Sequence, residues 1–188
     1  MSQESVVPRV RFLVGGARSG KSRLAVEMAR SATEVLFVAT ARGSDEDMRR
    51  RIARHREERP AEWRTLEAPV RLPEAIRRDV TPRQTVILDC LTFWVSNLMA
   101  ERGTETESVL EERVLERADA LVEAIGDHGR RWIVVSNEVG TGLHPETPVG
   151  RRYRDLLGQV NQRIADAADR SLLVVAGQVL PLRPAPEG

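Results

Sequence analysis

Five short apolar runs, separated by longer stretches, set the strongest limit on how this chain can fold. Each run is rich in β-branched residues and bounded by polar or turn-forming residues, which is typical of a buried strand. The runs span Val10–Val14, Val35–Ala39, Thr85–Leu91, Trp132–Ser136 and Ser171–Ala176. Between them, apolar residues recur with helical spacing, as in Glu107–Ile125 and Arg152–Ala168. Strands that alternate with such helices predict an α/β fold, a mostly parallel sheet with helices on both faces.

The alternation continues along the whole chain, and its 188 residues suit one domain. We find no internal repeat and no linker rich in glycine and serine. Only the ends, residues 1–8 and 181–188, have the composition of loose tails. Glycines and prolines in Thr141–Gly150 predict a substantial loop at one edge of the sheet. The chain is therefore expected to form a single domain over residues 1–188.

Charge and cysteine content exclude several classes of function. The 29 basic residues nearly balance the 28 acidic ones, and only 4% of the residues are aromatic. A net charge of +1 with so few aromatic rings argues against a nucleic-acid-binding groove. No apolar run approaches the roughly 18 residues of a membrane span, and Met1–Arg9 lacks the apolar centre of a signal peptide. Since Cys90 is the one cysteine, no internal disulfide forms, and we expect a cytoplasmic protein.

The segment Gly15–Ser22 follows the first apolar run and matches the phosphate-binding pattern G-x-x-x-x-G-K-[ST] at every specified position. Its glycines let backbone N–H groups surround phosphate oxygens, and the helix predicted at Arg23–Arg30 adds the partial positive charge of its N-terminus. Lys21, the only lysine of the chain, can reach the outer phosphates, and Ser22 can bind Mg²⁺. We therefore expect nucleotide contacts at Gly15, Gly16, Ala17, Arg18, Ser19, Gly20, Lys21 and Ser22.

Two acidic residues stand at the ends of predicted strands, where ligands bind in open α/β sheets. Asp89 is the candidate second ligand of Mg²⁺, directly or through water. The alternative is that Asp89 caps the helix that starts near Thr92. Glu138 is a possible base that orients a hydroxyl group or a metal-bound water. A helix-capping or structural role for Glu138 is an equally open alternative.

The segment Asp45–Arg59 has the pattern of a helix crowded with arginines. Pairs of opposite charge four residues apart account for part of this charge as a solvated face. The remaining guanidinium groups predict a second element that contacts phosphate, because arginine holds phosphate in bidentate fashion. The arginines are Arg49, Arg50, Arg51, Arg54, Arg56 and Arg59.

One histidine, His55, lies on the stripe of this helix formed by Met48, Ile52 and Arg59, which we expect to turn inward. An inward histidine is most often a packed, hydrogen-bonded core residue, and this is one interpretation. The other is a nucleophile, because neighbouring guanidinium groups disfavour a cationic ring and a neutral imidazole nitrogen can attack phosphorus. The other two histidines, His128 in a predicted turn and His144 in a predicted loop, are weaker candidates.

Several segments resemble those of one known family. They are GGARSGKS at Gly15–Ser22, VAT at Val38–Thr40, RIARHREERPAEWRTLE ending at Glu67, LDCLTFWVSNL at Leu88–Leu98, and the run from Ser136 to Asp169. Together they resemble the bifunctional adenosylcobinamide kinase / adenosylcobinamide-phosphate guanylyltransferase of cobalamin biosynthesis. The resemblance extends from Val10 to Gly177. Its most specific parts, the His-Arg-x-x-Arg-Pro-x-x-Trp-Arg-Thr-x-Glu run and Asn-Glu-Val-Gly, are not general to P-loop proteins.

The resemblance implies a P-loop NTPase core of the RecA-like kind and two successive reactions. ATP or GTP first phosphorylates the aminopropanol hydroxyl of adenosylcobinamide. GTP then transfers GMP to a histidine, which is His55 here, and the histidine passes it to adenosylcobinamide phosphate to give adenosylcobinamide-GDP. A homotrimer with sites between subunits is also implied. Beyond the phosphate loop, the implied nucleotide contacts are Ala39, Thr40, Ala41, Arg56, Glu57, Glu58, Arg59, Glu67 and Asp89.

Two other functions compete with this interpretation. The first is a single-function P-loop kinase of another small metabolite, in which His55 is structural. The second is a nucleotide-dependent switch or a nucleic-acid-associated ATPase without a metabolite acceptor. The low net charge and sparse aromatic content argue against the second alternative.

Overall fold

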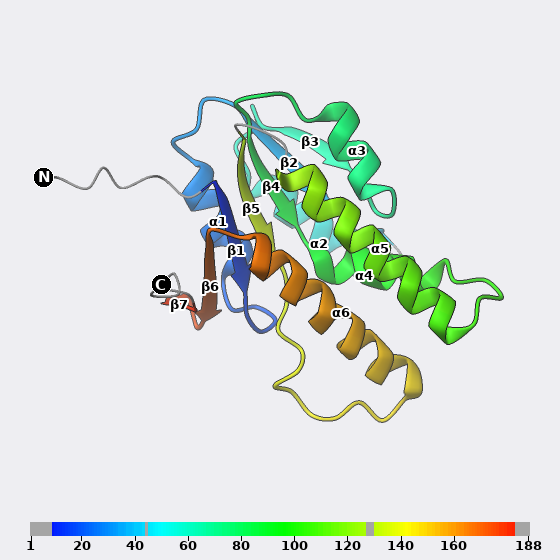
Figure 1. Ribbon diagram of the computed structural model, residues 1–188. Coiled ribbons are helices and arrows are strands. Elements are labelled where there is room, and N and C mark those ends of the chain that lie inside the picture. Colours follow the sequence, from blue (N-terminus) through cyan, green and yellow to red (C-terminus); the bar gives the residue numbers. More distant parts are fainter. Residues whose placement is uncertain (1–8, 44, 127–129, 183–188) are drawn as a thin grey trace, which may run out of the picture.

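The structure is a computed structural model that describes residues 9–43, 45–126 and 130–182. One seven-stranded sheet forms its centre, and helices pack against it (Figure 1). The elements in chain order are β1 (Val10–Val14), α1 (Lys21–Ala29), β2 (Val35–Ala39), α2 (Glu46–Glu57), β3 (Arg64–Glu67), α3 (Leu72–Asp79), β4 (Thr85–Asp89), α4 (Leu91–Ala100), α5 (Glu107–Gly126), β5 (Arg131–Val135), α6 (Pro148–Ala167), β6 (Arg170–Val175) and β7 (Gln178–Pro181).

The strand order is β3-β2-β4-β5-β1-β6-β7. All neighbouring strands are parallel except β6 and β7, which form an antiparallel hairpin. The predicted α/β fold with a mostly parallel sheet is therefore confirmed. Because β5 lies between β1 and β4, the loop after β1 and the carboxylate that ends β4 are separated by one strand.

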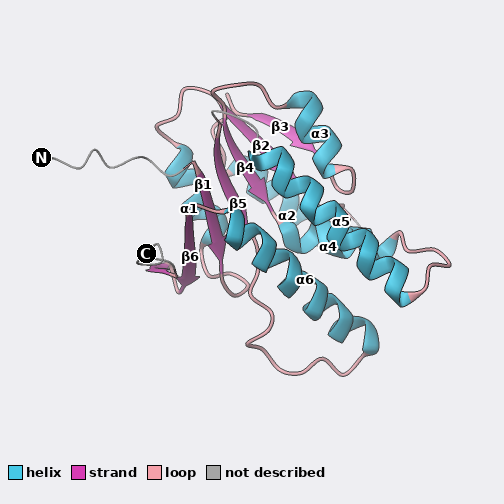
Figure 2. Ribbon diagram, in the orientation of Figure 1, coloured by secondary structure: helices cyan, strands magenta, loops and turns pink. Residues whose placement is uncertain are grey.

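Alternating side chains divide the sheet into two apolar faces. One face packs against α3, α4, α5 and α6, and includes Val86 and Leu88 of β4. The other face packs against α1, and includes Ile87 of β4 and Phe37 of β2. Figure 2 shows the strands as one layer with α5 and α6 along the same side. Helices therefore cover both faces of the sheet, as predicted. The candidate site described below lies on the face that packs against α1.

Helix α2 is attached differently from the other helices, since it contributes no buried side chain. Its half-buried side chains are Met48, Ile52 and His55, and Arg59 just after the helix is half-buried as well. This is the stripe expected to turn inward. Asp45 caps the helix by accepting a hydrogen bond from the backbone N–H of Met48 at 2.8 Å.

Three elements were not predicted from the sequence, namely β3, α3 and β7. The strand expected over Thr85–Leu91 ends earlier, at Asp89, because Leu91 already begins α4. The C-terminal tail expected from Pro181 begins later, since Pro181 is the last residue of β7. The expected tail residues 1–8 and 183–188 lie outside the described residues, as does His128. Within the described ranges, no helix is both long and apolar enough to cross a membrane.

Candidate active site

The loop between β1 and α1 has the backbone that its glycines permit. Gly15 and Gly20 adopt positive φ angles of 156° and 101°, which favour glycine. A Cβ atom on Gly15 would lie 2.2 Å from the carbonyl oxygen of Val174 on β6. Neighbouring segments hold the loop by backbone hydrogen bonds. Glu138 donates to the oxygen of Gly15 at 3.0 Å, and Gly177 to that of Ser19 at 2.9 Å.

Lys21 begins α1 and is 6% exposed. Its ammonium group donates hydrogen bonds to the carbonyl oxygens of Gly15 at 2.9 Å and Gly16 at 2.6 Å, and to the hydroxyl of Ser19 at 3.3 Å. Burial lowers the pKa of Lys21, whereas the negative charge of Asp89 opposes that shift. The only lysine of the chain is thus held against the loop whose pattern requires it.

Asp89 ends β4 on the α1 side of the sheet, because it has the same alternation as Ile87. Thr40 fixes the residue after it: the Thr40 hydroxyl donates to the carbonyl oxygen of Cys90 at 2.6 Å and accepts from its N–H at 3.0 Å. The backbone N–H of Thr40 donates to the oxygen of Asp89 at 3.3 Å. Since the Thr40 side chain is fully buried, it serves to hold the Asp89 segment in place.

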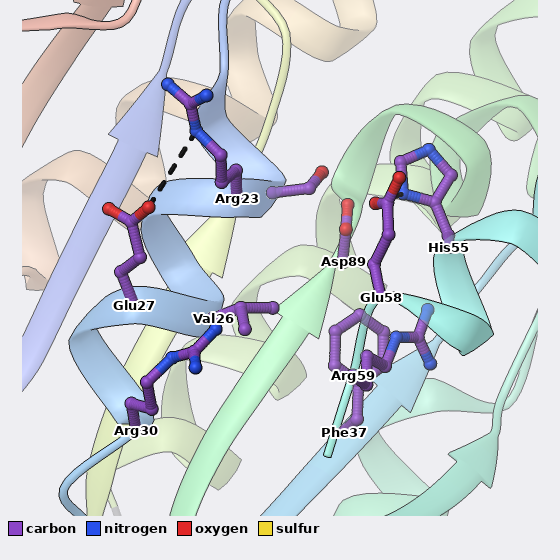
Figure 3. Close-up of a pocket in the computed structure, with 10 residues that line it drawn as sticks. Arg23, Val26, Glu27, Arg30, Phe37, His55, Glu58, Arg59 and Asp89 are labelled. Carbon is purple, nitrogen blue, oxygen red and sulfur yellow. Dashed lines mark ion pairs between the residues drawn. The ribbon is translucent and has the colours of Figure 1, made fainter. Parts of the chain in front are cut away.

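A cavity of about 440 Å³ lies beside the phosphate loop, between α1 and the C-terminal end of α2 (Figure 3). It brings together five residues singled out from the sequence. These are Ser22, His55, Glu58, Arg59 and Asp89. They come from four places in the chain: the start of α1, the end of α2, the turn that follows α2, and the end of β4.

His55 lines this cavity with a side chain that is 33% exposed. Its Nδ1 atom lies 3.4 Å from Oε2 of Glu58, one helical turn further on. The His55 side chain is therefore not fully buried in the core, and its role as a nucleophile stays a prediction. His144 lies elsewhere, on the exposed loop before α6, where its Nδ1 is 3.0 Å from a guanidinium nitrogen of Arg154.

Arg59 lies over the ring of Phe37, with its guanidinium carbon 3.2 Å from the ring centroid. This is a cation–π contact, and Phe37 itself belongs to the apolar face beneath. Burial lowers the pKa of Arg59, and the nearby Asp89 opposes that shift. The ring therefore holds a positive group at the cavity wall.

Other predicted residues lie away from this cavity. Glu67 lines a second cavity, of about 740 Å³, between β3, α3 and α5. Ala39 pairs with both Glu67 and Asp89, so these acids lie two strands apart, roughly 10 Å by normal strand spacing. Arg56 and Glu57 point outward as exposed side chains.

Glu138 contributes its backbone to the phosphate loop, as described above, but its carboxylate turns back on its own loop. Oε1 accepts a hydrogen bond from the N–H of Gly140 at 2.5 Å. The side chain does not line the cavity that contains His55. Its role as a base therefore stays a prediction.

Sequence reasoning misses five residues of the cavity wall. They are Arg23, Val26, Glu27, Arg30 and Phe37. Four of them recur every three or four residues along α1, so they form one face of that helix (Figure 3). This spacing was visible in the sequence, but nothing in it indicated that the face borders a cavity.

Ser22 and Asp89 fit a magnesium ion in the way that nucleotide-binding proteins usually hold one. Mg²⁺ is typically bound by one or two protein oxygens together with phosphate oxygens and water, and not by a complete protein cage. The described residues contain no cluster of three or more histidine, cysteine or acidic side chains arranged to hold a metal.

The fold and the phosphate loop define a nucleotide-binding P-loop protein with a RecA-like core. Two solved structures have a similar fold. An ATPase from the type III secretion system of pathogenic bacteria matches with a TM-score of 0.52 at 12% identity, over 88% of this chain and 52% of that one. A protein from Pyrococcus horikoshii OT3 matches with a TM-score of 0.56 at 7% identity, over 95% and 88%.

Sequence comparison identifies the family. The model for cobinamide kinase / cobinamide phosphate guanyltransferase matches residues 11–182. The bifunctional adenosylcobalamin biosynthesis protein CobP of Pseudomonas aeruginosa is 41% identical over 176 residues, which cover 93% of this chain and 98% of that protein. The CobU protein of Escherichia coli is 37% identical over 172 residues, covering 88% and 95%. The chain therefore belongs to this family and combines the kinase and guanylyltransferase activities for which the family is named.

Proposed function

We propose that the two activities use the cavity between α1 and α2, with the phosphate loop serving the kinase reaction and His55 serving the guanylyl transfer. The observation that carries this proposal is that Ser22, Asp89 and His55 line one cavity. A cavity shared by the end of a phosphate loop, a strand-terminal carboxylate and a histidine suits chemistry at a nucleotide's phosphorus atoms. Membership of a family named for both activities argues against the two alternatives, a single-function kinase and a nucleotide-dependent switch.

In the kinase reaction, the aminopropanol hydroxyl of adenosylcobinamide attacks the γ-phosphorus of ATP or GTP, and the nucleoside diphosphate leaves. Lys21 and the backbone N–H groups of Gly15–Ser22 bind the phosphates and offset the charge that spreads over their oxygens. Ser22 and Asp89 would hold Mg²⁺, which would neutralise phosphate charge when bound. The described chain supports this role for Lys21 because its ammonium already lies within the loop.

In the transferase reaction, an imidazole nitrogen of His55 attacks the α-phosphorus of GTP. A nitrogen–phosphorus bond forms as the bond to pyrophosphate breaks. A phosphate oxygen of adenosylcobinamide phosphate then displaces the histidine and gives adenosylcobinamide-GDP. The carrier lets each displacement at phosphorus be in line. Arg59, held over Phe37 at the cavity wall, is positioned to bind phosphate oxygens during both displacements.

Incubation with GTP labelled at the α-phosphorus tests the carrier. We expect label on the protein that is labile in acid and stable in alkali, as a phosphoramidate is. The variant His55→Ala should lose the label and the transferase reaction while keeping kinase activity, because phosphorylation of the hydroxyl needs no carrier. The matched control is His144→Ala, which should label like the wild type. Labelling of His55→Ala at the wild-type level would contradict the assignment.

The proposed functional unit is a homotrimer, as the family resemblance implies. Exposed apolar side chains on the β6–β7 hairpin and just after it support self-association. They are Val175, Val179, Leu180 and Leu182, which are 41–59% exposed. Exposed apolar side chains gathered on one hairpin in this way are often found at an interface between protein chains.

A further inference from the structure

Glu58 lies beside His55 at the end of α2, and the carboxylate oxygen Oε2 is 3.4 Å from Nδ1 of the imidazole (Figure 3). Both side chains line the cavity, with 33% exposure for His55 and 57% for Glu58. We infer that Glu58 is a positioning residue: its carboxylate keeps the proton of His55 on Nδ1, so that Nε2 is the nitrogen that attacks phosphorus. This inference rests on the proposed role of His55 as the guanylyl carrier.

The chemistry of the two side chains supports this direction. A neutral imidazole has one N–H donor and one nitrogen lone pair, and its neighbours decide which nitrogen has which. An ionised carboxylate can only accept hydrogen bonds. A carboxylate that faces Nδ1 therefore favours the proton there and leaves the lone pair on Nε2. A carboxylate behind a reacting histidine has the same orienting effect in other enzymes.

The pair also balances charge during transfer. When Nε2 attacks the α-phosphorus, the N–P bond forms, pyrophosphate leaves, and the ring becomes cationic because Nδ1 keeps its proton. The negative charge of Glu58 lies next to that cation. When the acceptor phosphate displaces the histidine, the N–P bond breaks and the ring returns to the neutral form with its proton still on Nδ1. No other proton donor or acceptor is needed.

Other charged groups lie around the cavity, but Glu58 is the carboxylate that pairs with His55. Arg59 follows it in the chain and lies over Phe37. From α1, Arg23 and Glu27 face the cavity as a pair with 3.8 Å between their charged atoms. Asp89 faces the cavity from β4. Among the ion pairs of the described residues, Glu58 is the partner of His55.

This role differs from the nucleotide contact that the family resemblance implies for Glu58, and kinetics separate the two. We would measure the rate constant for incorporation of α-labelled GMP as a function of GTP concentration in Glu58→Ala, Glu58→Gln and Glu58→Asp. A positioning residue predicts that Glu58→Ala lowers the limiting rate constant about 10- to 100-fold, with little change in the half-saturating GTP concentration. Glu58→Asp, which keeps the carboxylate, should recover part of the rate.

The opposite pattern overturns the inference. If the limiting rate constant is unchanged, or only the half-saturating GTP concentration rises, then Glu58 contacts the nucleotide and does not position His55. The control is Glu62→Gln, an exposed carboxylate outside the cavity, which should behave like the wild type. The variant His55→Ala distinguishes the two proposals. If it is labelled as strongly as the wild type, His55 is not the carrier and the proposed function fails. If it loses the label, His55 is the carrier, and the Glu58 variants then decide the role of Glu58.

A second measurement reads the position of the His55 proton directly in the wild-type protein. The chain has three histidines, so ¹⁵N-labelled histidine gives few signals in a long-range ¹H–¹⁵N spectrum, and the signal missing from His55→Ala identifies His55. We expect the wild type to show His55 with its proton on Nδ1 and the near-isosteric Glu58→Gln to show that preference weakened. A wild-type ring with its proton on Nε2 would overturn the inference.

Discussion

Lys21 is a buried ammonium whose three hydrogen bonds all go to its own loop. The loop oxygens thus hold the charge where we propose that the outer phosphates of a nucleotide bind. The phosphate-loop pattern alone is enough to propose a role for Lys21, because the loop determines both the position of the ammonium group and its hydrogen-bond partners.

Replacing Lys21 by methionine tests that role at the residue scale. Methionine keeps the length and removes the charge, so the kinase transition state loses one positive group, and we expect kcat to fall about 10²- to 10³-fold. The measurement is steady-state phosphorylation of cobinamide. As control, Arg131→Met removes a positive charge at the amino end of β5, the end of the strand opposite to the phosphate loop, and should leave the rate unchanged. A rate within twofold of the wild type in Lys21→Met would contradict the assignment.

Cys90 provides a second residue-scale prediction. Burial raises the pKa of its thiol to about 12, and the neighbouring Asp89 adds to the shift. At pH 8 the folded protein should therefore react with a thiol-specific disulfide reagent far more slowly than the chain unfolded in urea. The folded state keeps a proton that the unfolded state releases above about pH 9, so the free energy of unfolding should also fall as the pH rises from 9 towards 12. Equal reaction rates in the two states would contradict this prediction.

At the scale of elements, the loop and the β6–β7 hairpin are built against one another. Gly15 approaches the backbone of Val174, and the N–H of Gly177 donates to Ser19. The antiparallel hairpin at the end of the chain, which the sequence analysis did not predict, is therefore part of the support of the phosphate loop.

Two glycine variants measure this close approach. In Gly15→Ala, the new methyl group would meet a backbone oxygen at 2.2 Å, and the φ angle of 156° is one that L-residues rarely adopt. We expect the free energy of unfolding to fall by about 1–3 kcal/mol, measured by urea denaturation. Gly16→Ala is the matched control, since a Cβ atom there meets nothing within 4 Å. Equal losses in the two variants would contradict the role of the Val174 contact.

The elements that the sequence predicted well are those whose pattern is long or deeply buried. β1, β2 and β5 appear within one residue of their expected bounds because continuous apolar runs indicate buried parallel strands. β3 (Arg64–Glu67) has only four residues and two charges, so it has no such pattern. Its position comes from pairing with β2, which is a tertiary contact.

The same division applies to the site. Ser22 and Asp89 were singled out because local patterns fix their type and their place, Ser22 at the end of the phosphate-loop pattern and Asp89 at the end of a strand. Arg23, Glu27 and Arg30 were missed, since a local pattern does not indicate that α1 and α2 face each other across a cavity. The pairing of His55 with Glu58 could be predicted only in part. A spacing of three residues in a helix permits the contact but does not favour Glu58 over other neighbours of His55.

At the scale of the whole molecule, the sheet exposes an apolar hairpin at one edge. Light scattering coupled to size-exclusion chromatography should give a mass of about 63 kDa, three times the 21.0 kDa of one chain. Leu180→Asp places a charge on the exposed hairpin and should lower the mass, because a buried charge opposes association. Val109→Asp, on an exposed apolar residue of α5, is the control. A wild-type mass of 21 kDa would contradict the trimer.

The lone lysine has a consequence for chemical labelling of the whole molecule. The side chains offer a single primary amine, and it lies inside the phosphate loop at 6% exposure. Amine-directed reagents such as activated esters and pyridoxal phosphate therefore have one internal target, because all the other lysine-or-arginine positions are arginines, whose guanidinium groups do not react with them. If Lys21 binds nucleotide phosphates as proposed, side-chain amine modification should fall when nucleotide is added, and no background of surface lysines has to be separated from that signal.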